Sequence, residues 1–280
     1  MIADILFGTA GPPESAHRDT SVDGLREVAR LKLDTMELEF VRGVRMGPET
    51  AKDVNNTANA LGMPLSVHAP YYINLASTDP DKHKASIKRI LDTARVAALC
   101  GADQVVFHPG FYQELPPKTV FRTILKNVKY LRKALDKENL TNIILRPEVT
   151  GKASQFGDPV ELFELCRELP GVLPCIDFSH YYARSLGESR TYEDFSRLLE
   201  SMGAVLGDAA LHNIHAHLSG IEYGRSGETR HVNMAQSGLD HKPVLRALQK
   251  FNARGRIICE SPDRGKDALT FKRFWKKLSL

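Results

Sequence analysis

The stretch that decides the fold runs from residue 103 to residue 149. It reads 103-DQVVFHPG-110, then 119-TVFRTILKNVKYLRKALDKENL-140, then 142-NIILRPEV-149. Its first and last segments are short apolar runs, which are typical of buried parallel strands. The middle segment is amphipathic with basic residues on its outer face, and it predicts a helix. A strand, a helix and a strand in this order make one unit of an α/β fold.

The same unit recurs along the chain. Further strand-like runs lie at 3–8, 35–40, 64–69, 173–178, 213–220 and 256–261, and further helix-like segments lie at 22–33, 83–101, 157–169 and 240–251. Eight strands that alternate with helices, at intervals of about 30 to 40 residues, predict an α/β fold of the (β/α)8 TIM barrel type as a single domain over residues 1–280. An open doubly wound sheet is the alternative. It is weakened because no GxGxxG or phosphate-loop glycine pattern follows the first strand.

Composition narrows the class of protein. The 280 residues are 42% hydrophobic and 26% charged, and the net charge of +4 weakly favours an anionic partner. The four cysteines form no CxxC pair, which suits a reducing compartment. The N-terminus lacks the features of a secretory signal, and no apolar run reaches about 18 residues. We therefore expect a monomeric, cytoplasmic protein with no membrane partner.

Polar residues interrupt the predicted strands at one end. They are His68, His108, Glu148, Asp177, His180, His215, His217 and Glu260. The C-terminal ends of barrel strands converge on one rim, where active sites are built, so six consecutive strands deliver imidazoles or carboxylates to one place.

A lone histidine at a strand end is more often a hydrogen-bonded structural residue than a ligand. The convergence of many such groups changes this balance, because buried charges need compensation, which a divalent cation supplies most directly. Imidazoles and carboxylates in similar numbers, without a thiol cluster, favour zinc, with manganese or iron as poorer alternatives. The candidates are too many for one zinc ion, so we expect two or three ions, an arrangement suited to phosphodiester hydrolysis.

Six segments resemble the endonuclease IV family of apurinic/apyrimidinic endonucleases. They are VHAPYYINLAS, VVFHPG, RPEVTGK with a following SQFG, CIDFSH, HLSG and a late CES, spread from about residue 60 to residue 262. The segments RPEVTGK and HLSGIEYG are most similar to archaeal-type members. The resemblance implies a TIM barrel of the xylose isomerase-like superfamily with a trinuclear zinc site.

The resemblance also assigns roles to residues of this chain. The implied metal ligands are His68, His108, Glu148, Asp177, His180, His217, His231 and Glu260. Glu148 would bridge two ions and act as the catalytic residue, whereas His215 would lie behind the ligands or serve as one if the strand register differs. In 227-GETRHVN-233, Thr229 stands where the family has an aspartate, and a threonine hydroxyl is a poor zinc ligand. Glu228 could substitute if the loop shifts, so the third ion is either weakened or held differently.

Two neighbouring tyrosines follow His68. Tyr71 matches an aromatic position that the resemblance places in the DNA stack at an abasic site, and Tyr72 stands where an aliphatic wedge is usual; both rings could instead pack the loop onto the rim. Asn74 is expected to hold the loop by bonding its backbone. Basic residues expected near the rim are Arg42, Arg45, Arg146, Lys152, Arg225 and Arg230, of which Arg45, Lys152 and Arg230 are weak candidates for DNA phosphate contacts.

The leading functional hypothesis is a zinc-dependent endonuclease that cleaves the phosphodiester 5′ to abasic sites in duplex DNA, as in base excision repair. The alternative is a sugar or sugar-phosphate isomerase or epimerase on the same barrel, with one or two manganese or magnesium ions and more carboxylate ligands. The imidazole-rich set, and the lack of a clear lysine or second glutamate base on an inner strand face, argue against this alternative. Thr229 in place of the aspartate argues mildly for it. A third hypothesis is a non-catalytic protein that binds damaged nucleic acid.

Overall fold

The computed structural model describes residues 4–278 and confirms the TIM barrel. The barrel strands, in chain order, are β1 Ile5–Ala10, β2 Thr35–Glu39, β3 Leu65–His68, β4 Gln104–Phe107, β6 Ile144–Pro147, β8 Cys175–Asp177, β9 Ile214–Leu218 and β12 Gly255–Cys259. All eight are parallel and pair in the order β6-β4-β3-β2-β1-β12-β9-β8. Parallel contacts of Leu145 with Val172 and of Glu148 with Cys175 join the two end strands and close the barrel.

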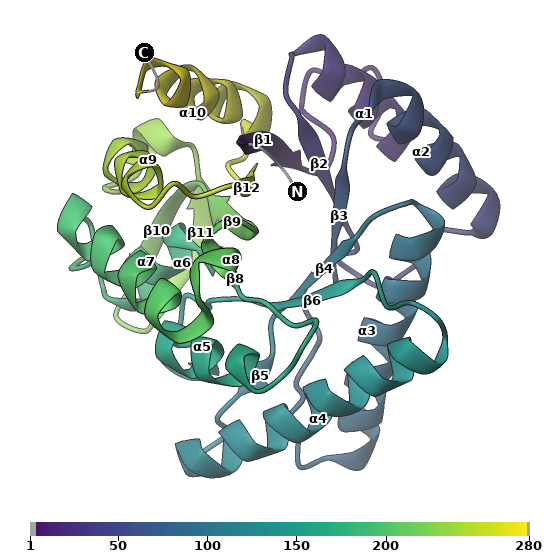
Figure 1. The fold of residues 1–280 in the computed structure, drawn as a ribbon, viewed down its shortest axis with the longest axis vertical. Coiled ribbons are helices and arrows are strands. Elements are labelled where there is room, and N and C mark those ends of the chain that lie inside the picture. The colour runs from purple at the N-terminus through teal and green to yellow at the C-terminus, as the bar shows by residue number, and fades with distance from the viewer. Residues whose placement is uncertain (1–3, 279–280) are drawn as a thin grey trace.

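Helices surround this ring of strands (Figure 1). They are α1 Ser21–Arg30, α2 Pro48–Leu61, α3 Pro80–Leu99, α4 Pro117–Lys137, α5 Pro159–Arg167, α6 Phe178–Arg184, α7 Tyr192–Leu206, α8 Asp208–Leu211, α9 His241–Lys250 and α10 Arg264–Leu278, with a 3-10 turn at Met234–Gln236. Several begin at strong sequence signals. Asp79 caps α3 and Asp158 caps α5 through their side chains, and each is followed by a proline, whose missing N–H costs nothing in the first turn.

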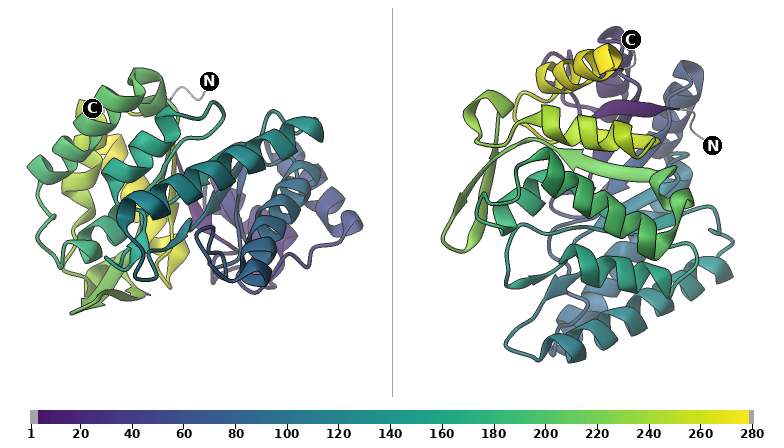
Figure 2. Two further views of the ribbon diagram at one scale, coloured as in Figure 1. Left: turned by 90° about the horizontal axis from the view of Figure 1, so that it is seen from below. Right: turned by 60° about the vertical axis from the view of Figure 1, so that its left-hand side comes forward.

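The eight predicted strands all form, each within about two residues of its predicted ends. Ala3, the first residue of the predicted run 3–8, lies outside the described residues. The sequence pattern missed two small antiparallel pairs: β5 Gly110–Phe111 with β7 Gln155–Phe156, and β10 Gly220–Gly224 with β11 Gly227–Val232. The yellow-green hairpin β10–β11 projects from one end of the barrel (Figure 2).

The lower half of the barrel interior is polar as well. Arg146 is fully buried and donates to the Gln104 side chain, the Pro174 carbonyl and Asn213. Arg256 is also buried and forms a two-pronged ion pair with Asp103. The expectation that Arg146 lies near the rim is therefore wrong: it precedes Glu148 by two residues, so it points inward on the same face but one layer deeper.

The four cysteines, Cys100, Cys166, Cys175 and Cys259, are buried and free. Within residues 4–278, no helix is both long and apolar enough to cross a membrane.

Candidate metal centre

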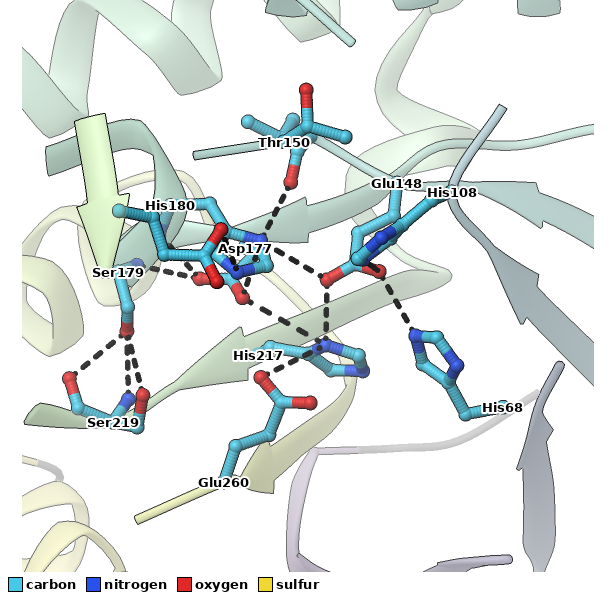
Figure 3. A network of polar contacts seen from close by, with 12 residues as sticks. His68, His108, Glu148, Thr150, Asp177, Ser179, His180, His217, Ser219 and Glu260 are labelled. Carbon is cyan, nitrogen blue, oxygen red and sulfur yellow. Dashed lines mark hydrogen bonds and ion pairs between the residues drawn. The ribbon is translucent and has the colours of Figure 1, made fainter. Parts of the chain in front are cut away.

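Glu148 lies at the middle of the rim cluster. It follows β6 and is fully buried, and each of its two carboxylate oxygens faces imidazoles. Oε2 lies 3.0 Å from His68 Nε2 and 2.9 Å from His108 Nε2, and Oε1 lies 3.0 Å from His217 Nδ1. Figure 3 shows these contacts, with the glutamate between the histidines of β3 and β9. His68, His108 and Glu148 form a first group of donor atoms close enough to share one ion.

A second donor group shares Glu148 and draws on the next strands. Asp177, His217 and Glu260 join Glu148, and their donor atoms all lie within 4.8 Å of one another. His217 Nδ1 lies 3.5 Å from Glu260 Oε2 and 3.9 Å from Asp177 Oδ2. This group contains three carboxylates and one imidazole.

Local helix chemistry links Asp177 to His180. Asp177 is the N-cap of α6, and its Oδ1 accepts from the backbone N–H groups of Ser179 and His180. Its Oδ2 makes no hydrogen bond; it lies 3.0 Å from His180 Nδ1 and belongs to the second donor group. The cap also fixes the first turn of α6, which directs the His180 ring toward the rim. The Asp-x-x-His spacing therefore brings both side chains to the site, because the aspartate caps the helix that carries the histidine.

The third donor group consists of His180, Glu228 and His231. His180 Nε2 lies 3.4 Å from Glu228 Oε2, and Ser219 Oγ lies 2.7 Å from His231 Nδ1, which leaves His231 Nε2 for the centre. Thr229 points elsewhere: its hydroxyl donates to the Glu222 carbonyl across the hairpin. Thus Glu228, rather than the residue in the family's aspartate position, faces this group.

The backbone explains how Glu228 reaches the site. The pairing of β10 with β11 shifts register between Glu222 and Tyr223, and the Glu228 N–H donates to the Gly151 carbonyl at 3.0 Å. A Cβ on Gly151 would lie only 2.5 Å from Glu228 Cβ and 2.7 Å from its Oε2. Glycine at 151 is therefore needed for the Glu228 side chain to pass.

His215 occupies a different layer from the donor groups around Glu148. It points into the barrel two residues before His217, and its Nε2 lies 2.8 Å from Glu37 Oε2. Its donor atoms also lie near Cys175 and His217. Burial lowers the pKa of His215 to about 4 and raises that of the Cys175 thiol to about 12, so both are neutral near pH 7. Of the two roles predicted for His215, the geometry favours support of the ligands.

Two carboxylates on β2 belong to the centre and were not assigned to it from the sequence. Glu37 is fully buried against His215 and His217. Glu39 is the register partner of His68, and its Oε1 is buried without a hydrogen bond. Alternation of two glutamates on one strand face was the available signal, but sequence alone could not show whether they met imidazoles or rim arginines.

The electrostatics show how strongly these groups perturb one another. Burial raises the pKa of Glu260 and of Glu39 to about 8 each. His68 keeps its proton despite burial, because its bond to Glu148 raises its pKa to about 10. The neighbouring imidazoles His108 and His217 overcome burial and hold the pKa of Glu148 well below its usual range. Such opposed shifts within one cluster of side chains are typical of functional sites.

The donor set fits divalent metal ions. Asp177 Oδ2, His180 Nε2 and Glu260 Oε2 are buried without hydrogen bonds, although each belongs to one of the donor groups. Their charged neighbours lie within 4 Å, but buried polar atoms without a hydrogen bond are costly, and metal coordination would satisfy them. Imidazole nitrogens and carboxylate oxygens are ligands that zinc and manganese accept.

The loop after β3 borders the centre. The Tyr71 ring lies 5.5 Å from that of His68 and 5.7 Å from that of His108, and it is 44% exposed. Tyr72 is 69% exposed, and its carbonyl accepts from Arg89. As predicted, Asn74 holds the loop: its Oδ1 accepts from the backbone N–H groups of Ala76 and Phe111.

The three residues predicted to contact phosphate differ in their exposure and in whether they form ion pairs. Arg45 lies exposed between β2 and α2. Lys152 is partly exposed beside Gly151, in the loop between β6 and β7 that contacts the β10–β11 hairpin. Arg230 is exposed but pairs with Glu222 at 2.8 Å across the hairpin, so it is the least available of the three.

Comparison with known proteins identifies the family to which this fold belongs. A family model described as "Xylose isomerase-like TIM barrel" matches residues 25–278. The chain belongs to the xylose isomerase-like TIM barrel family. An uncharacterised protein of Methanocaldococcus jannaschii is 44% identical over 275 residues, covering 98% of both chains. A probable endonuclease 4 of Mycobacterium bovis is 31% identical over 219 residues, covering 76% of this chain and 79% of the relative.

Solved structures with a similar fold include proteins whose names describe different activities. A D-tagatose 3-epimerase-like protein has a TM-score of 0.73 at 18% identity, covering 98% of this chain and 96% of the other. Endonuclease IV from Thermus thermophilus has a TM-score of 0.72 at 20% identity, covering 97% and 99%. At these identities the likeness establishes the fold. Activity has to be inferred from the donor groups of this chain.

Proposed function

We propose that this protein is a zinc-dependent endonuclease that cleaves the phosphodiester 5′ to abasic sites in duplex DNA. The observation that carries the proposal is the presence of three donor groups around Glu148, two of them rich in imidazole. A site for a single oxygen-preferring ion would need only one such group. The 31% identity with a probable endonuclease 4 supports the same activity.

Zinc ions held by these groups would supply Lewis acidity toward water and toward the phosphate oxygens. The protein side chains set up that chemistry. Glu148 offers one oxygen to each of two neighbouring groups and, held ionised by its imidazoles, can orient an attacking water. His180, Glu228 and His231 form a separate group beside the first two, where a phosphate oxygen could be neutralised.

The loop after β3 would meet the DNA. Tyr72 is free to enter a gap in a base stack, whereas Tyr71 packs partly on the ligand histidines and so lines the mouth of the centre. Stacking of an aromatic ring against nucleic acid contributes roughly 1–3 kcal/mol. An abasic nucleotide is cheap to extrude because it has no base to unstack.

The test combines metal analysis with incision. Wild-type protein and Glu148→Gln are loaded with zinc and given a duplex that carries one abasic analogue. We expect the wild type to cut 5′ to the lesion and leave a 3′-hydroxyl. Glu148→Gln should lose at least about a hundredfold in rate, because one oxyanion bridges two groups. Incision by Glu148→Gln at the wild-type rate would remove Glu148 from the mechanism.

A second candidate is a sugar or sugar-phosphate epimerase. It is favoured by the buried carboxylate of Glu39, an additional inner-face glutamate whose role the sequence left open. The group of Glu148, Asp177, His217 and Glu260 would then hold a single manganese ion. Wild-type protein with one manganese ion, no incision and turnover of a ketose would establish this candidate in place of the endonuclease.

A further inference from the structure

Glu37 is the most deeply placed carboxylate of the centre. It is fully buried on β2, one layer below the donor groups around Glu148. Its Oε1 lies 2.9 Å from His217 Nε2, an ion-pair contact outside hydrogen-bond geometry, and its Oε2 lies 2.8 Å from His215 Nε2, with which it forms a hydrogen bond. A buried carboxylate destabilises the fold unless neighbouring groups compensate its charge.

The two nitrogens of His217 face opposite layers. Nδ1 points up to Glu148, Asp177 and Glu260, and Nε2 points down to Glu37. An imidazole ligates a metal through the nitrogen that carries no proton, so a carboxylate at Nε2 selects the form with the proton on Nε2 and the lone pair on Nδ1.

Glu37 is itself held in place. The Ser66 hydroxyl donates to Oε2 at 2.6 Å, and His215 shares the same oxygen. Both partners are fully buried. Because both engage Oε2, Oε1 is left for His217, and the carboxylate cannot turn away without breaking two contacts.

We propose that Glu37 is a positioning residue: held by Ser66 and His215, it orients His217 so that Nδ1 serves the donor group of Glu148, Asp177 and Glu260. The inference rests on the proposed metal centre, and it assigns β2 a part in that centre. Loss of such a supporting contact lowers metal affinity by about 10- to 100-fold.

The test measures zinc affinity in the absence of DNA, by competition with a chromophoric chelator. Glu37→Gln should bind one ion about 10- to 100-fold more weakly than the wild type. Glu27→Gln is the matched control, since Glu27 is also a buried glutamate but pairs with Arg30 on the outer helix α1. It should bind zinc as the wild type does.

Long-range 1H–15N correlation spectra of the zinc-loaded proteins give a second readout. Wild-type His217 should carry its proton on Nε2, and Glu37→Gln should populate another form. If Glu37→Gln does not fold, Ser66→Ala decides instead, with an affinity loss of a few fold. Wild-type affinity and an unchanged His217 spectrum in the folded variant would overturn the inference. Wild-type protein that binds zinc but leaves abasic DNA uncut would overturn only the proposed function.

Discussion

At the residue scale, carboxylates and imidazoles alternate in the centre, and the protonation of each group affects the pKa of its neighbours. The carboxylates around Glu148 lie beside imidazoles that they share: His217 faces Glu148, Asp177 and Glu260, and His180 faces Glu148, Asp177 and Glu228. In the absence of metal, protons must balance this charge, which is why His68 holds a proton to high pH and Glu260 does so beyond its usual range. Metal ions would replace those protons.

This balance predicts how the stability of the metal-free protein depends on pH. The pKa of His68 is raised from 6.5 to about 10, so its contribution is full below pH 6.5 and is lost as pH rises toward 10. Glu39 and Glu260 have pKa values raised to about 8, so they destabilise the fold increasingly from about pH 4.5 to pH 8. Between pH 6.5 and pH 8, both effects lower the stability of the metal-free protein as the pH rises.

We therefore expect the Tm of chelator-treated protein to fall by several degrees from pH 6.5 to pH 8, and zinc to restore more of it at the higher pH. Scanning calorimetry with and without zinc measures both. Glu39→Gln should flatten the decline in the metal-free protein. A metal-free Tm that rises over this interval would contradict the assigned shifts.

At the scale of elements, the hairpin β10–β11 completes the third donor group. Its register shift and its contact with Gly151 bring Glu228 to the centre and turn Thr229 away. The sequence indicated both possibilities for this segment. It could not choose between them, because an irregular strand pair leaves no periodic pattern that fixes which side chain faces inward.

Gly151→Ala should remove one ion from the centre. The added methyl group would displace Glu228, so the group of His180 and His231 would lose its carboxylate. Elemental analysis should show one zinc fewer per chain than in the wild type. Thr229→Ala is the control and should keep the full complement, since its hydroxyl bonds only the Glu222 carbonyl. An unchanged metal content in Gly151→Ala would exclude Glu228 as a ligand.

At the scale of the whole molecule, the barrel interior has an upper layer that contains the candidate metal centre and a lower layer that contains the buried arginines. The lower layer is tied by Arg146, whose guanidinium joins Gln104 on β4 to the segments that precede β8 and β9. Burial lowers its pKa to about 10, so it remains charged at neutral pH. The hydrogen bonds that its guanidinium donates stabilise the buried charge in place of a counter-ion.

Arg146→Ala should cost about 3–5 kcal/mol of unfolding free energy, because it leaves buried acceptors without donors. Urea denaturation measures the loss, and zinc affinity of the folded fraction should stay at the wild-type value. Arg95→Ala removes a partly exposed ion pair with Glu138 and should cost under about 1 kcal/mol. Equal costs for the two variants would refute a structural role for Arg146.

The fold was predictable because parallel strands are apolar, short and regularly spaced, and their C-terminal ends share one rim. That rule alone brought His68, His108, Glu148 and Asp177 together. It failed for contacts that depend on depth inside the barrel. Glu37 meets His215 across 178 positions of sequence, and Arg146 lies below the rim although it is only two residues from Glu148.

The central claim is that three donor groups hold three ions. Anomalous diffraction at the zinc edge, on crystals of zinc-loaded protein, tests it most directly. We expect three peaks, located at His68–His108–Glu148, at Glu148–Asp177–His217–Glu260 and at His180–Glu228–His231. A single peak at the second of these groups, with the other two empty at saturating zinc, would contradict it.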